Sequence, residues 1–244
     1  MSLWLDSLSQ LSVAVMSIMK REDGRKPEEL RPLEIRAGII KNAQGSAWVR
    51  MGKTQCIAGV YGPKEYLPKH KQRSDRAVLK CVYTMAPFST KERVRPGPSR
   101  RSTEISMVTT DALAPVIFLE EFPKSVIEVY INIVQADAGT RTAGINAAAV
   151  ALADAGIPMR DLVSSVAVGK VNGEYVVDLA GHEEESTAAD LPIAFIPRTR
   201  QLSLLQMDGD VSPEDVKKLV ALAIKGCEKI YEAQKKALRD RWKT

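Results

Sequence analysis

The pattern of apolar and polar residues predicts a chain built from many short strands and a few helices. Segments rich in Val, Ile, Trp and Tyr, bounded by Gly, Asn and Pro, predict β-strands at 33–40, 46–51, 54–61 and 77–85. An almost continuous apolar run predicts a buried strand over 125–134. Later strands are expected at 163–170, 174–179, 191–196 and 201–207, with Asn172-Gly173 as the hairpin turn between the first two of them.

Three segments predict helices. The first covers 103–119, where Pro115 is expected to kink the helix or end it early. The second, 143–155, is rich in small residues and follows the buried strand at once. The third begins at Ser212, an N-cap residue followed by Pro213 in the first helical position and by a capping-box acid. Its apolar residues then recur on one helical face, at Val216, Leu219, Val220, Ala223, Cys227 and Ile230.

The organisation of the chain favours one folded unit. A polar run at 20–31 marks where the folded part begins, and polar insertions follow at 62–76 and 89–101. Neither an internal repeat nor a linker divides the rest, so we expect a single α+β domain over 20–244. Residues 1–19 are expected to be a flexible N-terminal extension; the alternative is a short amphipathic segment that docks on a partner.

Composition and charge narrow the function. The 244 residues carry 35 Lys and Arg against 30 Asp and Glu, and the net charge of +5 mildly favours a polyanionic partner. Cys56, Cys81 and Cys227 lie far apart, which argues for a reducing compartment and against a disulfide framework or a structural zinc. The uncharged stretch 7–19 is too short to span a bilayer and lacks the basic start of a signal peptide. We therefore expect a cytoplasmic protein with no membrane partner.

The segment 137–141, Asp-Ala-Gly-Thr-Arg, joins the buried strand directly to the small-residue helix. Helix N-termini bind anions through unpaired N–H groups and the positive end of the helix dipole. Gly139 would let an oxyanion approach the backbone, Thr140 adds a hydroxyl donor and Arg141 adds a guanidinium fork. These residues predict a phosphate site. The alternative is that Asp137 and Thr140 only cap the helix while Arg141 is solvated.

Both polar insertions are basic. The insertion at 89–101 carries Lys91, Arg93, Arg95, Arg100 and Arg101 against one acid, Glu92. The insertion at 62–76 carries Lys64, Lys69, Lys71, Arg73 and Arg76, and Tyr66 and His70 could stack on bases there. Such loops either grip a nucleic-acid backbone or are simply solvated. On the first interpretation, the residues that contact nucleic acid are Lys69, His70, Arg73, Arg93, Arg95, Arg100 and Arg101.

Five carboxylates lie between two predicted strands, at Asp178, Glu183, Glu184, Glu185 and Asp190. An acid placed opposite a cationic phosphate site can hold a divalent ion or donate a proton to a leaving oxygen. Most carboxylates in loops do neither, so spacing alone does not select among these five.

Four motifs resemble the ribonuclease PH family of phosphorolytic 3′→5′ exoribonucleases. They are D-G-R-K-P-E-E-L-R-P at 23–32, V-Y-G-P-K-E at 60–65, P-S-R-R at 98–101, and Q-A-D-A-G-T-R-T-A-G-I-N from residue 135. The resemblance is ordered and spans residues 23 to 240. Within the family, P-F-S-T-K-E-R and G-I-P-M-R-D-L are most similar to the catalytic ring subunits of archaeal exosomes.

This resemblance implies the α+β ribonuclease PH fold, which is of the ribosomal-protein-S5-domain-2 type. It also implies a hexameric ring of three heterodimers, each with a homologous non-catalytic subunit. Cap subunits with S1 and KH or zinc-ribbon modules would cover the ring, and RNA would thread through its pore. Lys69 stands where the family usually has an arginine at the pore neck.

The family's functional residues carry over by position. Arg100 and Arg101 match the pair that holds the terminal RNA phosphates, and Gly139, Thr140 and Arg141 match the site for inorganic phosphate. Asp190 and Glu184 match two acids that donate a proton or hold a metal, Mg²⁺ or Mn²⁺. Glu184 replaces the usual Asp and is one methylene longer.

The expected reaction is attack of inorganic phosphate, as co-substrate, on the last phosphodiester of RNA, with reversible release of nucleoside diphosphates. One alternative is a non-catalytic, RNA-binding scaffold subunit of such a ring. The other is a homohexameric, tRNA-trimming ribonuclease PH. Silent paralogues typically lose parts of the arginine and acid sets. This chain keeps both arginines, the G-T-R run and the last acid, which favours catalysis.

Overall fold

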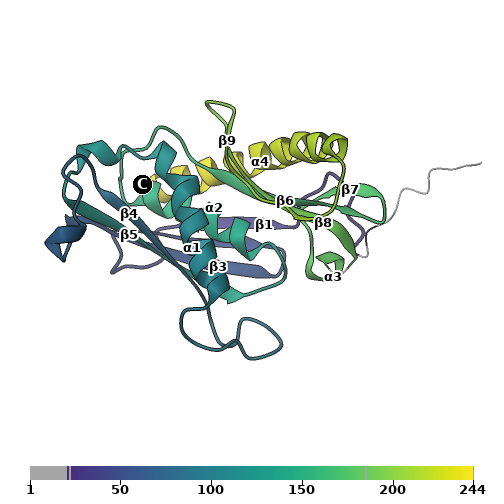
Figure 1. Ribbon diagram of the computed structural model, residues 1–244, viewed down its shortest axis with the longest axis horizontal. Helices are drawn as coiled ribbons and strands as arrows, with labels where there is room; N and C mark the ends of the chain where they lie inside the picture. Colours follow the sequence, from purple (N-terminus) through teal and green to yellow (C-terminus); the bar gives the residue numbers. More distant parts are fainter. Residues whose placement is uncertain (1–20, 22, 185, 244) are drawn as a thin grey trace, which may run out of the picture.

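Two β-sheets lie on either side of helix α2 (Thr140–Asp154) in the computed structural model, which describes residue 21 and residues 23–184 and 186–243 (Figure 1). The N-terminal extension expected at 1–19 lies outside the described residues. The first sheet has the strand order β1-β2-β3-β5-β4. Its strands are β1 (Leu33–Ala37), β2 (Gly45–Met51), β3 (Thr54–Glu65), β4 (Val78–Met85) and β5 (Ser125–Gln135). All neighbours are antiparallel except β4 and β5, which run parallel.

The second sheet is antiparallel and comes from the C-terminal half of the chain. Its order is β10-β8-β6-β7, with β9 also paired to β8. The strands are β6 (Ser164–Val171), β7 (Glu174–Val177), β8 (Thr187–Ile196), β9 (Gln201–Leu205) and β10 (Asp208–Gly209). Asn172 and Gly173 have positive φ values of 48° and 88° and form the predicted turn between β6 and β7.

The helices differ from the prediction mainly at their ends. Helix α1 (Arg100–Leu113) starts three residues early and stops before a 3₁₀ turn, η2 (Ala114–Val116), that contains Pro115. Helix α2 also starts three residues earlier than predicted, at Thr140. Helix α4 (Pro213–Trp242) begins with the predicted capping box of Ser212 and Asp215.

Three short turns were not predicted, because segments of three or four residues carry no periodicity. They are α3 (Gly181–Glu184), η1 (Lys69–Lys71) and η3 (Leu119–Glu121). The strand expected at 201–207 ends at Leu205 as β9, and the two-residue strand β10 that follows lies outside the predicted range.

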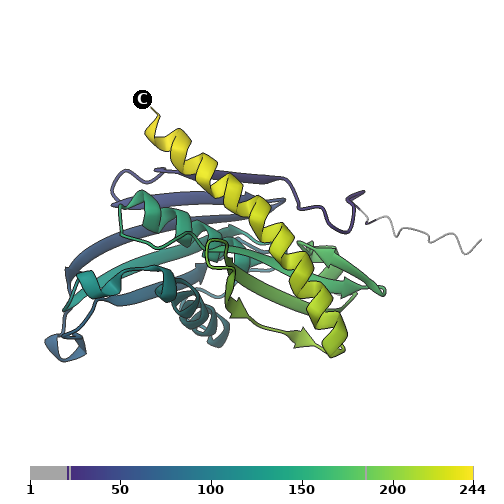
Figure 2. The ribbon, with the colours of Figure 1, turned by 90° about the horizontal axis from the view of Figure 1, so that it is seen from above.

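Helix α2 is buried on all sides because both sheets pack on it. Thirteen of its 15 residues are buried, and it contacts β2 and β3 of the first sheet and β6 of the second. Its small side chains permit a close approach: a Cβ atom on Gly45 would lie 2.3 Å from the carbonyl oxygen of Ala151. Helix α4 covers β6, β7 and β8 and reaches over β1, as the view from above shows (Figure 2).

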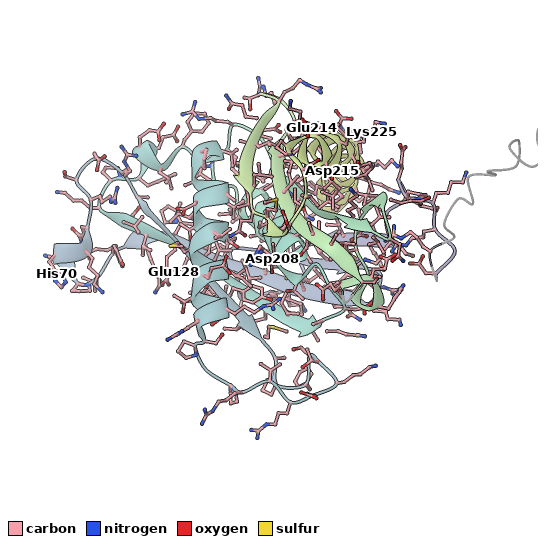
Figure 3. All side chains as sticks on the ribbon, turned by 45° about the vertical axis from the view of Figure 1, so that its right-hand side comes forward. His70, Glu128, Asp208, Glu214, Asp215 and Lys225 are labelled. Carbon is pink, nitrogen blue, oxygen red and sulfur yellow. The ribbon has the colours of Figure 1, made fainter. Side chains whose placement is uncertain are left out.

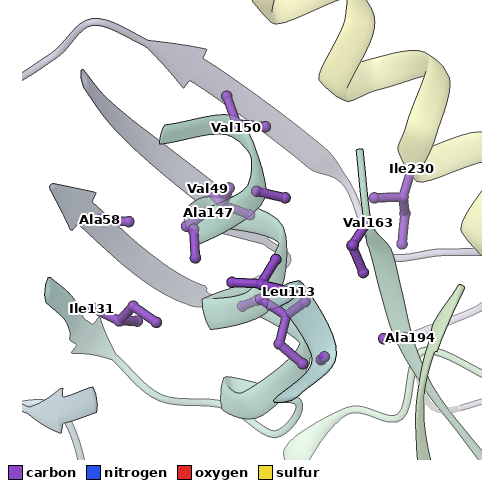
Figure 4. Packing of buried hydrophobic residues seen from close by; sticks show 14 of the residues in the cluster. Val49, Ala58, Leu113, Ile131, Ala147, Val150, Val163, Ala194 and Ile230 are labelled. Carbon is purple, nitrogen blue, oxygen red and sulfur yellow. The ribbon is translucent and has the colours of Figure 1, made fainter. Parts of the chain in front are cut away.

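Side chains from both sheets meet in one continuous core (Figure 4). Val49, Ala58 and Ile131 of the first sheet approach α2 from one side. Val163 and Ala194, near and within the second sheet, belong to the same cluster, as does Ile230 of α4. The predicted α+β fold is therefore confirmed, with a main hydrophobic core that both sheets share.

The parallel pair β4 and β5 brings two helix N-termini to one edge of the first sheet. Because the strands run in the same direction, both end at that edge. Residues 86–99 lead from β4 to the start of α1, and residues 136–139 lead from β5 to the start of α2. The two helices pack against each other, so their first residues open toward the same region.

Ile131 is fully buried in the middle of β5 and tests this core. We expect Ile131→Ala to lower the free energy of unfolding by roughly 2–5 kcal/mol, because it leaves a cavity under α2. Leu67→Ala, at a side chain that is 65% exposed, should change it by less than about 0.5 kcal/mol. Urea unfolding of both variants measures the difference, and equal effects would contradict this packing.

Candidate active site

A cavity of about 590 Å³ opens where the N-termini of α1 and α2 meet the second sheet. Six of the residues that the sequence singles out line it: Arg101, Gly139, Thr140, Arg141, Glu184 and Asp190. The segment 206–209, which was not predicted to be functional, completes the wall. We call this cavity the arginine–carboxylate pocket. Its size is that of an ordinary small-molecule site.

The phosphate side of the pocket is the first turn of α2. Gly139 is the N-cap residue with φ of 62°, and no side chain caps the helix. Ala138 also has a positive φ, 58°, which is a strained conformation for a residue with a Cβ and one that concentrates at functional sites. Because Asp137 and Thr140 do not cap the helix, its first N–H groups remain available to an anion. The helix-cap alternative is therefore wrong.

Arg141 is held in place by an acid that the sequence did not reveal. Its Nη2 atom lies 2.9 Å from Oε2 of Glu104, on α1. The other oxygen of Glu104 accepts a hydrogen bond of 2.9 Å from Gln206 Nε2. Glu104 thus joins α1, α2 and the segment after β9, and Arg141 is not freely solvated. The only sequence signal for Glu104 is its place one turn after Arg100 and Arg101.

The acidic side of the pocket comes from β8 and α3. Asp190 lies opposite Gly169 of β6 and Asp208 of β10 in the sheet. Its Oδ1 atom is buried and has no hydrogen-bond partner among the described residues. Burial, reinforced by the negative charge of Glu184, raises the pKa of Asp190 from 3.8 to about 6, although Arg141 and Arg101 oppose the shift.

Glu184 ends α3 and also lines the pocket. Although the residue as a whole is solvent-exposed, the walls around its carboxyl remove part of the surrounding water and raise its pKa. No ion pair within 4 Å connects Arg101 or Arg141 to Glu184 or Asp190 in the described part of the chain. Opposite charges therefore share one cavity without neutralising one another through direct contact.

A buried network fixes the segments that carry these acids. Asp178, 1% exposed, accepts hydrogen bonds from the backbone N–H of Arg31 (2.8 Å) and from its Nη2 (2.7 Å). Arg31 also donates to the carbonyl oxygen of Asp137, at 2.5 Å. Glu183 is buried and paired with Arg21 at 2.5 Å. Of the adjacent glutamates, Glu183 therefore anchors α3 and Glu184 faces the pocket.

The remaining predicted residues lie outside this pocket. Arg100 begins α1 but is exposed and does not line the cavity. Arg93 and Arg95 are exposed in the loop that precedes it. In the described residues, none of these three forms an ion pair.

Lys69, His70 and Arg73 are exposed at the opposite end of β5, which has 11 residues and is therefore roughly 33 Å long. Figure 3 shows His70 at one end of the molecule, well away from Asp208 in the pocket wall. Within one chain, the structure does not bring these three residues to the pocket.

The pocket suits a divalent metal only if a substrate completes the site. The described residues contain no group of three or more His, Cys, Asp and Glu side chains arranged to hold a metal ion. Mg²⁺ commonly binds through one or two carboxylates together with substrate phosphates. The unpartnered Oδ1 of Asp190, beside Glu184, fits that arrangement and not an all-protein cage.

Comparison with protein families shows to which family the chain belongs. Residues 29–158 match the model of the 3′ exoribonuclease family, domain 1, and residues 161–226 match its domain 2. The chain belongs to the ribonuclease PH family of 3′ exoribonucleases. The boundary between the two family models falls between α2 and β6, although both parts share one core.

Curated relatives and a solved structure place this family member more closely. It is 52% identical to exosome complex component Rrp41 of Methanopyrus kandleri over 91% of this chain and 93% of that protein. It is also 52% identical to Rrp41 of Pyrococcus furiosus, over 91% and 89% of the two chains. The crystal structure of rice (Oryza sativa) Rrp46 superposes with a TM-score of 0.81 at 25% identity, over 90% of this chain and all of that one. The family and fold that the sequence predicted are confirmed.

Within the described part of the chain, no helix is both long enough and apolar enough to cross a bilayer. The cytoplasmic location stays a prediction.

The raised pKa of Asp190 predicts a measurable cost to stability. A carboxyl that titrates at 3.8 when unfolded and at about 6 when folded binds more protons in the folded state, so it destabilises the fold as pH rises through this range. At pH 8, Asp190→Asn should raise the free energy of unfolding by up to about 3 kcal/mol. At pH 4 it should change little.

Urea unfolding at the two pH values tests this expectation, with Asp111→Asn, at an exposed residue of α1, as the control. A change of the same size at both pH values would show that burial does not perturb Asp190.

Proposed function

We propose that this protein is a phosphate-dependent 3′→5′ exoribonuclease and the catalytic subunit of an exosome ring. The observation that carries the proposal is the convergence of Arg101, Arg141 and the α2 N-terminus on one cavity with Asp190. The exosome components named Rrp41, 52% identical over most of the chain, support the same assignment.

Inorganic phosphate would bind at the N-terminus of α2, where Thr140 and Arg141 donate to its oxygens. Arg101, with Arg100 at the rim, would hold the phosphate of the last nucleotide. An oxygen of inorganic phosphate forms a bond to that phosphorus, and the bond to the 3′ oxygen of the preceding nucleotide breaks. The products are a nucleoside diphosphate and an RNA shortened by one nucleotide.

The charges in the pocket address the main difficulty of this reaction, which is that nucleophile and target are both anions. Two guanidinium groups and a helix N-terminus lower the repulsion and stabilise charge that develops on the phosphoryl oxygens. Because Glu104 already orients Arg141, little reorganisation is needed when phosphate arrives. One diester is exchanged for one anhydride, so excess nucleoside diphosphate should drive the reverse, tailing reaction.

Asp190 would donate the proton that the departing 3′ oxygen needs. Its raised pKa keeps part of its population protonated near neutral pH, as a general acid requires. A bound Mg²⁺ or Mn²⁺ would be held by Asp190 and Glu184 and would supply positive charge to the phosphate oxygens.

The relatives also support a set of partners. The exosome components named Rrp41 and the shared fold of rice Rrp46 support a ring built with other ribonuclease PH subunits. We propose a hexamer of three heterodimers with a homologous non-catalytic subunit, S1 and KH or zinc-ribbon caps, and RNA in the pore. The exposed Lys69, His70 and Arg73 would then meet RNA far from the pocket of their own chain.

Two alternative functions can be distinguished from this proposal by experiment. A scaffold subunit would bind RNA without chemistry, so a ring reconstituted with Asp190→Asn would degrade RNA as fast as the wild-type ring. A homohexameric ribonuclease PH would form an active six-membered ring from this chain alone. The presence of Arg101, Arg141, Glu184 and Asp190 in one pocket favours the catalytic subunit.

The decisive test is phosphate dependence in the reconstituted ring. We expect nucleoside diphosphates to appear only with phosphate, and Asp190→Asn to slow the reaction roughly 10²–10⁴-fold, the usual contribution of a general acid. Asp111→Asn is the matched carboxylate control. Equal decay in phosphate-free buffer, with release of monophosphates, would replace phosphorolysis by hydrolysis.

The pH dependence separates the two roles of Asp190. A general acid works in its protonated form, so the rate at saturating phosphate should fall as pH rises above about 6. Glu184→Gln removes the neighbouring negative charge and lowers the pKa of Asp190, which should move the fall to lower pH. The rate of the Glu184→Gln variant is divided by the wild-type rate at each pH, because the titration of phosphate itself affects both rates equally. A ratio of variant to wild-type rate above one below pH 6 would instead show that Asp190 acts as a carboxylate.

A further inference from the structure

A second cavity, of about 690 Å³, lies beside the arginine–carboxylate pocket. Lys53, Phe88, Ser89, Lys91, Asp137 and Gly181 are among the residues that line it, and we call it the Phe88 cavity. No part of the mechanism described above uses it. The combination of an aromatic ring, two lysines and a neighbouring catalytic pocket suggests a role in holding substrate.

Phe88 is exposed although its backbone is fixed. Its side chain is 74% exposed. It stands on a turn closed by a hydrogen bond of 2.9 Å from the Ser89 N–H to the Ala86 carbonyl oxygen. The Ala86 N–H donates to Ile133 of β5 at 2.9 Å, and the Ala136 N–H donates to Ser89 at 2.8 Å. The turn therefore fixes where the ring is attached, and the exposed ring offers a large apolar face on which a flat partner can stack.

The surroundings of Phe88 favour an anionic partner. Lys53 and Lys91 are exposed in the wall of the cavity, and neither forms an ion pair with a described residue. Ser89 is 3% exposed, and its hydroxyl finds no hydrogen-bond partner in the described part of the chain. Rings that stack bases beside lysines that pair with phosphates are the usual means of binding single-stranded nucleic acid.

The Phe88 cavity and the arginine–carboxylate pocket share a wall. Gly181 lines the first and Glu184 lines the second, at the two ends of the single turn of α3. Asp137 lines the first, and Gly139, two residues later, lines the second. The two wall segments touch, since a Cβ on Gly181 would lie 2.5 Å from Oδ1 of Asp137. The two cavities are therefore neighbours, divided by the contact between these two segments.

We propose that the Phe88 cavity binds a nucleotide of single-stranded RNA next to the one being cleaved. The base stacks on Phe88, and Lys53 and Lys91 pair with the flanking phosphates. The role of this subsite in catalysis rests on the proposed phosphorolysis. RNA binding to it can be tested without the reaction. The competing occupant is a neighbouring protein subunit that covers Phe88 in the ring.

RNA binding is measured by fluorescence anisotropy with a 5′-labelled oligoadenylate in phosphate-free buffer, on the assembled ring. We expect Phe88→Ala to weaken binding roughly tenfold, since stacking of one base contributes about that factor, and Phe88→Trp to retain it. Trp242→Ala, at an aromatic residue 67% exposed on α4, is the matched control and should leave affinity unchanged. The double variant Lys53→Ala/Lys91→Ala should reduce the slope of log affinity against log salt by about 1.4.

Unchanged RNA affinity in Phe88→Ala would overturn the subsite. If Phe88→Ala instead dissociates the ring in size-exclusion chromatography, the residue belongs to a protein interface, and the proposal is equally wrong. Because binding is measured without phosphate, these outcomes do not depend on phosphorolysis. Failure of the proposed function would appear separately, as a wild-type ring that binds RNA but releases no nucleoside diphosphate.

Discussion

The interaction between Arg31 and Asp178 holds the two halves of the site together. Asp178 is almost completely buried in a left-handed backbone conformation (φ 56°), so its charge requires a partner. Arg31 supplies that partner and also binds the carbonyl of Asp137, in the loop that leads to the phosphate site. The first sheet's phosphate loop and the second sheet's acidic segment are thereby fixed to one side chain. Loss of either member of such a buried pair leaves an uncompensated charge, which typically costs about 3–5 kcal/mol.

The pocket that results keeps its arginines close to Asp190 and Glu184 without a direct ion pair between the two sets. Arg141 pairs with Glu104, and Glu183 pairs with Arg21. Arg141 therefore does not neutralise the acids that face the cavity, and Glu183 does not neutralise its arginines. Asp190 is left with a raised pKa and an unpartnered oxygen. This arrangement suits transfer between two phosphates, where cations must meet the anions and an acid must remain protonated. It also explains why a mere RNA-binding scaffold is a poor description, because a scaffold does not require a destabilising carboxylate.

Local features of the sequence predicted most of the fold. The Asn172-Gly173 turn, the Ser212 capping box and the glycine-led start of α2 each depend on neighbouring residues, so each was visible without tertiary structure. The roles of Glu104 and Arg31 were not visible, because their partners lie 37 and 147 positions away. Residues that are close to a site-forming strand in the sequence can also lie far from the site. Lys69 and His70 follow β3 closely, yet the length of β5 separates them from the pocket.

The position of a bound oxyanion tests the central claim most directly. Crystals of the protein soaked in tungstate, a heavy analogue of phosphate, would locate the anion by its anomalous signal. The account predicts a tungstate at the N-terminus of α2, within hydrogen-bonding distance of Thr140 and Arg141 and facing Arg101. Tungstate bound only on other basic surfaces, with the arginine–carboxylate pocket free of it at saturating concentration, would contradict the account.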